Sequence, residues 1–209
     1  MPGTLPGGTG GGLTPGQRRQ LELYLDILYG AQPALKLTRV PREEAWSRHV
    51  EESLDLLRAR EWHAGETVLD LGSGGGVPGI PLAVARQELR VVLVERSRAR
   101  AAFLLSSLGQ LGLGGVRVLA RDAAELAGTG EVSGVDVMVS RAAVPPPRLL
   151  GLAARLLRPG GEGLVHVGSS FWDRGTAADL APLFPTLTGL RVEAVGGSHL
   201  LRFAARLSR

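Results

Sequence analysis

Residues 68–81 constrain the fold of this chain most strongly, because they read as a strand, a tight loop and a helix start in direct succession. The apolar run Val68-Leu69 ends at Asp70, and glycines and prolines then crowd the positions up to Pro81. Glycine adopts positive φ without steric cost and lets a ligand approach the bare backbone. The unpaired N–H groups at the start of a helix can face such a ligand. The stretch therefore predicts a ligand-binding turn in an α/β protein.

From Gly65 onward, short apolar runs alternate with helical patterns, which is typical of parallel strands joined by crossover helices. The last two apolar runs are separated by Gly196-Gly197, which indicates a hairpin and one antiparallel strand at the end of the sheet. The predicted fold is a doubly wound, Rossmann-like α/β sheet, mostly parallel with a C-terminal antiparallel hairpin. The predicted strands are 67–71, 91–95, 116–120, 135–140, 163–167, 190–195 and 200–205, and the predicted helices are 80–86, 98–111, 123–126 and 148–157.

The residues before this alternation divide into two parts. The first is rich in glycine and has almost nothing to bury, so we expect it to be disordered. The second shows apolar residues at helical spacing, and Thr14-Pro15 is typical of a helix N-terminus. The predicted parts are a disordered lead (1–13), an N-terminal helical extension (14–64) and a main domain (65–209), and the extension has helices over 17–29 and from 42 or 43 to 57.

Composition narrows the functional classes. The 209 residues include no cysteine, which excludes disulfides and thiolate metal sites, and the four histidines are scattered, so we expect no metal site. We find neither a membrane span nor a secretory signal, and we expect a cytoplasmic protein without a membrane partner. The net charge is +4, and nearly all of the cationic side chains are arginines. Guanidinium groups suit phosphate, so a nucleic-acid partner is compatible, although this charge is also ordinary for a soluble protein.

The glycine spacing alone fits two classes of cofactor. Residues 74–79 match the dinucleotide fingerprint, and Glu95 ends the next strand, where an acid could hold ribose hydroxyls. The acid Asp70 before the first glycine is instead similar to the pattern of methyltransferases that use S-adenosylmethionine. A carboxylate there attracts the ammonium group of that cofactor, whereas it would repel a pyrophosphate. Asp122 after the third strand and the terminal hairpin favour the same choice. We therefore predict S-adenosylmethionine as the cofactor, with a nicotinamide-dependent dehydrogenase as the less favoured alternative.

Several longer motifs point to one family. Residues 70–81 end in Pro-Gly-Ile-Pro, a tail that is unusual among methyltransferases. Leu37-Thr38 match the end of the family's Asn-Leu-Thr, with Lys36 in place of the asparagine. Arg48-His49-Val50 with Ser53 match Arg-His-Ile-x-Asp-Ser, with Glu52 in place of the aspartate, and residues 140–142 match Ser-Arg-Ala. Residues 95–104 fit an acid followed by Lys-Arg-x-x-Phe-Leu. With these motifs the chain resembles, from about residue 14 to 206, the bacterial 16S ribosomal RNA guanine-N7 methyltransferases, the RsmG or GidB family.

This resemblance implies methyl transfer from S-adenosylmethionine to N7 of a guanine in the 530 loop of 16S rRNA, guanine 527 in the family. The substrate would be the small ribosomal subunit or its precursor, and we expect the protein to be a monomer. Guanine N7 loses no proton on attack, so in-line transfer requires no general base. Arg141 is expected to position the acceptor, with His49 as a second candidate. The residues expected to bind the cofactor are Asp70, Gly72, Ser73, Gly74, Gly76, Pro78, Gly79, Glu95, Asp122, Ala123, Ala124, Glu125 and Arg141.

The chain departs from the family pattern at positions where the family carries basic residues. The replacements nearest the expected site are Ala123, Val167 and Ser198. Lost phosphate contacts would weaken rRNA binding. Basic neighbours that could compensate are Arg121, His166, His199 and Arg202. Two alternatives therefore stay open: an enzyme of the same fold with a small-molecule or protein acceptor, and a non-catalytic module that binds the cofactor or RNA.

Overall fold

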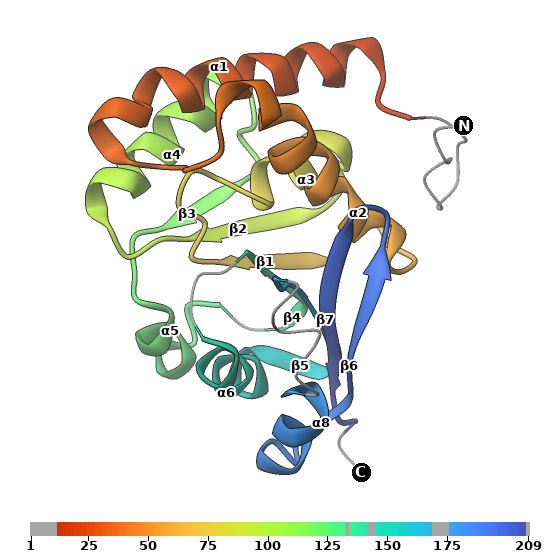
Figure 1. The fold of residues 1–209 in the computed structure, drawn as a ribbon. Helices are drawn as coiled ribbons and strands as arrows, with labels where there is room; N and C mark the ends of the chain where they lie inside the picture. Colours follow the sequence, from red (N-terminus) through yellow and green to blue (C-terminus); the bar gives the residue numbers. More distant parts are fainter. Residues whose placement is uncertain (1–11, 133, 142–144, 169–175, 208–209) are drawn as a thin grey trace.

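The structure is a computed structural model that describes residues 12–132, 134–141, 145–168 and 176–207 (Figure 1). Its centre is a seven-stranded sheet in the order β3-β2-β1-β4-β5-β7-β6. The strands are β1 (Thr67–Leu71), β2 (Arg90–Val94), β3 (Arg117–Leu119), β4 (Val135–Arg141), β5 (Leu157–His166), β6 (Leu187–Val195) and β7 (Ser198–Ala205). The helices are α1 (Pro15–Leu35), η1 (Arg42–Glu44), η2 (Trp46–Glu51), α2 (Glu52–Arg58), α3 (Gly79–Ala85), α4 (Arg98–Leu111), α5 (Ala123–Thr129), α6 (Pro146–Leu156), α8 (Thr176–Leu180) and η3 (Ala181–Leu183).

The sheet has the predicted topology. Strands β1 to β5 pair in parallel, while β7 pairs antiparallel with both β5 and β6. The mostly parallel sheet with a C-terminal antiparallel hairpin is thereby confirmed. β1 lies between β2 and β4. The connection after β1 runs to β2 and β3 on one side of it, and the later strands β4 and β5 lie on its other side. Such a switch point opens a crevice at the carboxyl ends of the strands, where open α/β sheets bind ligands.

Helices cover both faces of the sheet (Figure 1). Helices α1 to α4 contribute to one hydrophobic core, and α5, α6 and α8 contribute to the other. Along β1, Val68 belongs to the first core and Leu69 to the second, because successive side chains of a strand point to opposite faces. Both residues are fully buried. The continuous apolar run of this central strand therefore follows from burial on both sides.

The N-terminal helices share the first core with the sheet. Thr14 caps α1 and forms a capping box with Gln17, as the Thr14-Pro15 pair predicts. The helix is longer than the predicted 17–29 and ends at Lys36, whose φ is +50°. The single helix predicted from residue 42 or 43 to 57 is wrong in detail. It is divided into the 3₁₀ turn η1, the π-helical turn η2 and the α-helix α2.

Several boundaries differ from the predicted ones. β5 begins at residue 157 rather than 163, because Leu157 pairs with Val135 before a register shift in the ladder. The short helices α8 and η3 are not among the predicted elements. Residues 1–11, most of the predicted disordered lead, lie outside the described residues. In the part of the chain that the structure describes, no helix is long and apolar enough to cross a membrane, and no group of His, Asp and Glu could hold a metal ion.

Candidate cofactor and acceptor site

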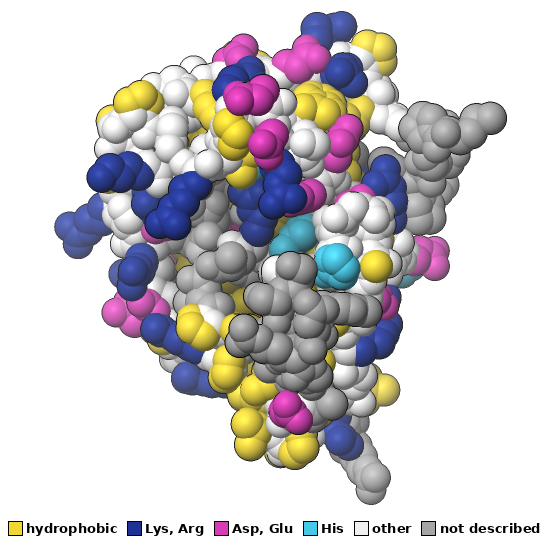
Figure 2. All heavy atoms as spheres, in the orientation of Figure 1, with side chains coloured by type: hydrophobic (Ala, Val, Ile, Leu, Met, Phe, Trp, Pro, Cys, Tyr) yellow, Lys and Arg dark blue, Asp and Glu magenta, His cyan; other side chains and the backbone are white. Residues whose placement is uncertain are grey.

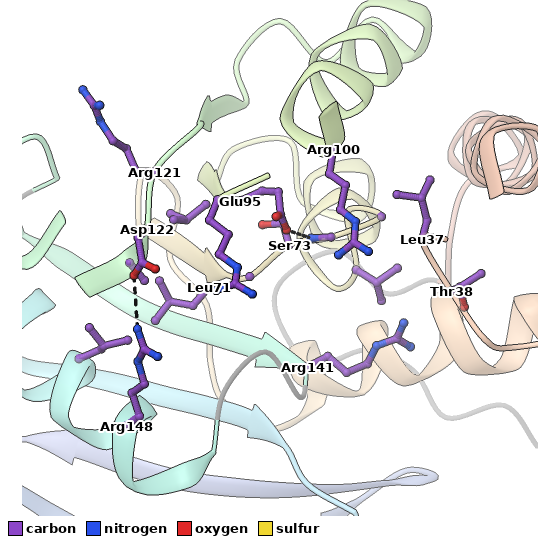
Figure 3. A pocket seen from close by; sticks show the side chains of 18 of the residues that line it. Leu37, Thr38, Leu71, Ser73, Glu95, Arg100, Arg121, Asp122, Arg141 and Arg148 are labelled. Carbon is purple, nitrogen blue, oxygen red and sulfur yellow. Dashed lines mark hydrogen bonds and ion pairs between the residues drawn. The ribbon is translucent and has the colours of Figure 1, made fainter. Parts of the chain in front are cut away.

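A cavity of about 530 Å³ opens at the carboxyl ends of β1, β2, β3 and β4 (Figure 3). The glycine loop after β1 forms part of its wall, together with residues at or just after the ends of the three other strands, the start of α6 and the segment that follows α1. This volume lies within the range of about 300–1,000 Å³ that is typical of small-molecule sites. The cavity thus occupies the crevice expected from the switch point of the sheet.

The glycine loop keeps its shape through its backbone. Gly72, Gly74 and Gly76 have φ angles of +71°, +55° and +97°, which side chains other than glycine rarely adopt. The N–H groups of Gly72 and Ser73 both donate to the carbonyl oxygen of Val94, at 2.9 and 3.0 Å. These bonds fasten the loop to the end of β2. The loop therefore presents a fixed and nearly bare backbone to the cavity.

Glu95 follows β2 and lines the cavity although it is buried. Its Oε2 accepts a hydrogen bond from the Gly74 N–H at 3.0 Å, and its Oε1 accepts one from the Ser97 N–H at 2.8 Å. Ser97 in turn caps α4. The carboxylate is thus held by backbone groups on both sides. A fixed carboxylate at a cavity wall is an acceptor suited to ligand hydroxyl groups.

Asp122 follows β3 and lies at one end of the cavity (Figure 3). It caps α5, because its Oδ1 accepts a hydrogen bond from the Ala124 N–H at 2.9 Å. The same oxygen lies 3.6 Å from Nη2 of Arg148, at the start of α6. Ala123 lines the cavity, whereas Ala124 and Glu125 do not belong to its lining. This end of the cavity therefore offers one carboxylate with an arginine beside it.

Asp70, at the end of β1, is fully buried and does not line the cavity. Its Oδ2 accepts a hydrogen bond from the Gly79 N–H at 3.1 Å, while its Oδ1 has no hydrogen-bond partner among the described residues. Burial raises the pKa of this carboxyl group to about 7. A side chain at Gly79 would come within 2.8 Å of Asp70 Oδ2. Asp70 thus braces the loop against α3, and its contact with the cofactor stays a prediction.

Arg141, His49 and Thr38 form a connected group at the other end of the cavity, and all three line it. Nη2 of Arg141 lies 3.0 Å from Nδ1 of His49, and Nε2 of His49 lies 2.9 Å from Oγ1 of Thr38. Arg141 also donates to the carbonyl oxygen of Arg48 at 2.7 Å. Burial and the neighbouring Arg141 lower the pKa of His49 to about 4, so its imidazole is neutral near pH 7.

The structure brings together some of the predicted site residues and leaves others behind the cavity wall. Those that line it are His49, Gly72, Ser73, Gly74, Glu95, Asp122, Ala123 and Arg141. Those outside the lining are Asp70, Gly76, Pro78, Gly79, Ala124 and Glu125. The sequence prediction of site residues also missed several that line the cavity, among them Leu28, Thr38, Arg96 and Arg148. Of the missed lining residues, Leu37, Thr38 and Arg100 had a signal, because they belong to motifs of the resembled family.

Arginines surround the cavity even though the expected basic positions are changed. Figure 2 shows Lys and Arg side chains gathered on the left and in the centre of the face that is in view. The arginines that line the cavity are Arg96, Arg100, Arg121, Arg141 and Arg148. Of the possible compensating residues, Arg121 is therefore in place, whereas Arg202 is paired with Glu162 and Glu193 away from the lining.

Ser198 and His166 are committed to contacts within the fold. Ser198 is buried, and its hydroxyl donates to Oδ2 of Asp55 at 2.9 Å. Nε2 of His166 lies 2.9 Å from the carbonyl oxygen of Glu52, and the residue is outside the cavity lining. Val167 is likewise outside it. His166 therefore does not supply the basic group that is missing at Val167.

Solved structures with the same architecture include an S-adenosylmethionine-dependent methyltransferase and a protein in complex with S-adenosylmethionine. The methyltransferase SibL in its apo form matches with a TM-score of 0.60 and 19% identity, over 91% of this chain and 76% of that one. A mutant of MtNAS in complex with S-adenosylmethionine matches with a TM-score of 0.60 and 18% identity, again over 91% and 76%. The sheet order and the glycine loop thus define the class I S-adenosylmethionine-dependent methyltransferase fold.

The chain belongs to the GidB family, described as rRNA small subunit methyltransferase G, whose family profile matches residues 17–198. A ribosomal RNA small subunit methyltransferase G from Sorangium cellulosum is 40% identical over 148 residues, 69% of this chain and 62% of the relative. The protein of the same name from Gloeobacter violaceus is 32% identical over 179 residues, 85% of this chain and 70% of the relative. The first of these matches spans less than two thirds of the relative's length.

Proposed function

We propose that this chain transfers the methyl group of S-adenosylmethionine to N7 of a guanine in the 530 loop of 16S rRNA, guanine 527 in the family. The observation that carries the proposal is one cavity that joins the glycine loop, Glu95 and Asp122 to an arginine, Arg141, at the end of β4. Membership of the rRNA small subunit methyltransferase G family supports the same substrate class.

The residues present fit the cofactor. The buried carboxylate of Glu95 would accept hydrogen bonds from the ribose hydroxyls, and Asp122 would lie beside the adenine. The bare backbone of Gly72 to Gly75 leaves room for the chain that joins the sulfur to the amino acid end. When bound, the cofactor supplies a methyl group on a positively charged sulfur. The protein's part is to hold that methyl group in line with the acceptor.

The acceptor side of the cavity suits a nucleophile that needs no base. Guanine N7 already carries a free lone pair, so the side chains have to orient the base rather than remove a proton. Arg141 is held by the carbonyl of Arg48 and by His49, which fixes its guanidinium at the end of β4. From there it would donate hydrogen bonds to the acceptor nucleotide. The neutral His49 would act through Arg141, as a positioning residue.

Arginines around the cavity would hold the phosphates of the rRNA. Arg96 and Arg121 follow β2 and β3, and Arg100 and Arg148 lie in α4 and α6. One guanidinium group can bind two oxygens of a phosphate at once. Each such contact increases the affinity for RNA by an amount that falls as the salt concentration rises. These positions differ from Ala123, Val167 and Ser198, where the family's basic residues are missing. The rRNA would therefore be held by a shifted set of cations.

The proposal is tested by incubating the full chain with labelled S-adenosylmethionine and small ribosomal subunits that lack the modification, and by mapping the methylated guanines. We expect label at N7 of one guanine in the 530 loop, and none with a Glu95→Ala variant. Label in small molecules or proteins, but not in rRNA, would favour the enzyme with a different acceptor. Cofactor and RNA binding without any turnover would favour the non-catalytic module.

A further inference from the structure

Thr38 lies on the segment that follows α1 and reaches the cavity from outside the sheet. The side-chain amide of Gln32 binds both backbone polar groups of Thr38: it donates to the Thr38 carbonyl oxygen and accepts from the Thr38 N–H. Nearby, the guanidinium of Arg100 donates to the carbonyl oxygen of Lys36 at 3.2 Å. The segment is thus tied to both α1 and α4, and Thr38 is fixed where it lines the cavity.

The direction of the hydrogen bonds in the Arg141–His49–Thr38 group follows from its chemistry. A guanidinium only donates, so Nδ1 of His49, 3.0 Å from Nη2 of Arg141, has to accept. The remaining proton of the neutral imidazole is then on Nε2, which donates to Oγ1 of Thr38 at 2.9 Å. The lowered pKa of His49, about 4, agrees with this neutral state. Arg141 thereby determines that Thr38 is an acceptor toward His49.

The hydroxyl of Thr38 consequently has a proton to donate elsewhere. Its oxygen accepts a second hydrogen bond from the Val40 N–H at 3.1 Å, which occupies both lone pairs. Over residues 12–132, 134–141, 145–168 and 176–207, the hydroxyl of Thr38 makes no hydrogen bond as a donor. Since Thr38 lines the cavity, the free proton is available to a ligand there. A ligand group at this point has to be a hydrogen-bond acceptor.

The charges around Thr38 favour a negatively charged acceptor. Arg141 and Arg100 line the same end of the cavity (Figure 3). The carboxylate of Glu52, which interacts electrostatically with Arg141, is already paired with Arg48. Figure 3 places Thr38 at the opposite end of the cavity from Asp122. A cofactor with its adenine at Asp122 would therefore bring its amino acid end toward Thr38.

We propose that Thr38 donates a hydrogen bond to the carboxylate of bound S-adenosylmethionine, with its proton directed into the cavity by Arg141 through His49. This inference rests on the proposed function for the identity of the cofactor, but not for the acceptor. It assigns to the segment after α1, far from the glycine loop in sequence, the recognition of the cofactor's amino acid end.

The test is a double-mutant cycle between the protein and the ligand, measured by calorimetry on the full chain. The two ligands are S-adenosylmethionine and decarboxylated S-adenosylmethionine, which lacks only the carboxylate. The variants are Thr38→Val, which removes the hydroxyl at nearly constant volume, and Thr38→Ser, which keeps it. We expect Thr38→Val to lower the affinity for S-adenosylmethionine about tenfold or more, as is typical when a hydrogen bond to a charged group is lost. Its affinity for the decarboxylated ligand should stay within about twofold, and Thr38→Ser should resemble the wild type with both ligands.

Equal losses for both ligands would overturn the inference, because Thr38 would then only support the fold of the cavity wall. No loss for either ligand would overturn it as well. The proposed function fails in a different way. A wild type that binds S-adenosylmethionine and shows the coupling, yet leaves rRNA unmethylated, contradicts the rRNA assignment and leaves the role of Thr38 intact.

Discussion

At the scale of single residues, two carboxylates at adjacent strand ends have different environments. Glu95 accepts hydrogen bonds from two backbone N–H groups and faces the cavity. Asp70 accepts one from Gly79, keeps an oxygen without a described partner and has its pKa raised by burial. Asp70 lies behind the cavity wall, whereas the Glu95 carboxylate is fixed by backbone groups at the wall itself. Glu95 is therefore the better candidate for direct contact with a ligand.

Glu95→Gln should weaken S-adenosylmethionine binding by at least about tenfold. The amide has one acceptor oxygen in place of two, so one of the N–H groups of Gly74 and Ser97 loses its partner and the ribose loses a charged acceptor. Isothermal titration calorimetry measures the effect. The matched control is Glu61→Gln, the same change at an exposed position. Equal affinities for the Glu95 variant and the control would show that Glu95 does not hold the cofactor.

His166 should make the protein less stable in mild acid. Burial lowers the pKa of His166 from 6.5 to about 4. Between these pH values the imidazole is protonated in the unfolded chain and neutral in the folded one. Its contribution is fully present above pH 6.5 and is lost as the pH falls toward 4. At pH 5 the loss is about 2 kcal/mol.

The free energy of unfolding in urea at pH 7.5 and pH 5 measures this loss. In His166→Gln the amide can still donate to the Glu52 carbonyl but does not titrate. The difference between the two pH values should therefore shrink in this variant by about 2 kcal/mol. An unchanged difference would assign the acid sensitivity to other groups, of which the buried His49 is the first candidate.

At the scale of elements, the glycine loop depends on α1 from the N-terminal extension. The hydroxyl of Tyr24 donates to the carbonyl oxygen of Gly75 at 2.9 Å, and both groups are buried. A Cβ atom at Gly75 would lie 2.7 Å from Cδ1 of Leu28 and 3.4 Å from Cβ of Leu37. The loop and α1 are thus in direct contact. The extension belongs to the wall of the cavity rather than to a separate unit.

Gly75→Ala should therefore destabilise the protein and weaken its binding of S-adenosylmethionine. The added methyl group has to displace Leu28, which is fully buried, and such overpacking costs about 1–3 kcal/mol. Gly109→Ala is the matched control, because Gly109 lies in α4 with open space around its Cβ position. The control should be neutral or up to about 1 kcal/mol more stable. Urea unfolding and calorimetry separate the two, and equal behaviour would contradict the contact between α1 and the loop.

Local patterns were sufficient for elements whose ends are marked in the sequence. α4 begins after the Ser97 cap and ends at Gly112 with φ of +67°, and its predicted bounds of 98–111 are confirmed. The division of residues 42–58 into three kinds of helical turn has no such marker. Glu95 and Asp122 could be placed at the cavity because strand ends meet at one sheet edge. The position of Thr38 could not, because it depends on how α1 packs across the sheet.

At the scale of the whole molecule, the chain has a modest net charge but a concentration of arginines at one cavity. Five arginines line it, while many of the others are paired with nearby carboxylates. Arg96 makes no ion pair with any residue in the described ranges. A cation with no acidic partner is the one that gains most from an RNA phosphate. The placement of the charges, rather than the net charge, is what favours the proposed rRNA substrate.

Arg96→Gln should lower the affinity for small-subunit rRNA and flatten its dependence on salt. Loss of one phosphate contact reduces the slope of log affinity against log salt by about one. Arg206→Gln is the matched control. Arg206 is exposed and follows the carboxyl end of β7, which runs antiparallel to β5 and so ends on the side of the sheet away from the carboxyl ends of the parallel strands. Filter binding over a series of salt concentrations gives both slopes. If the two variants share one slope, Arg96 does not contact the RNA.

The proposed methyl transfer is tested most directly by the amount of 7-methylguanosine formed per small ribosomal subunit, measured by mass spectrometry of rRNA fragments after reaction with excess S-adenosylmethionine. We expect close to one 7-methylguanosine per subunit, confined to the fragment that holds the 530 loop, and far less with Glu95→Gln in the same time. A wild type that binds S-adenosylmethionine but forms no 7-methylguanosine in that fragment would contradict it.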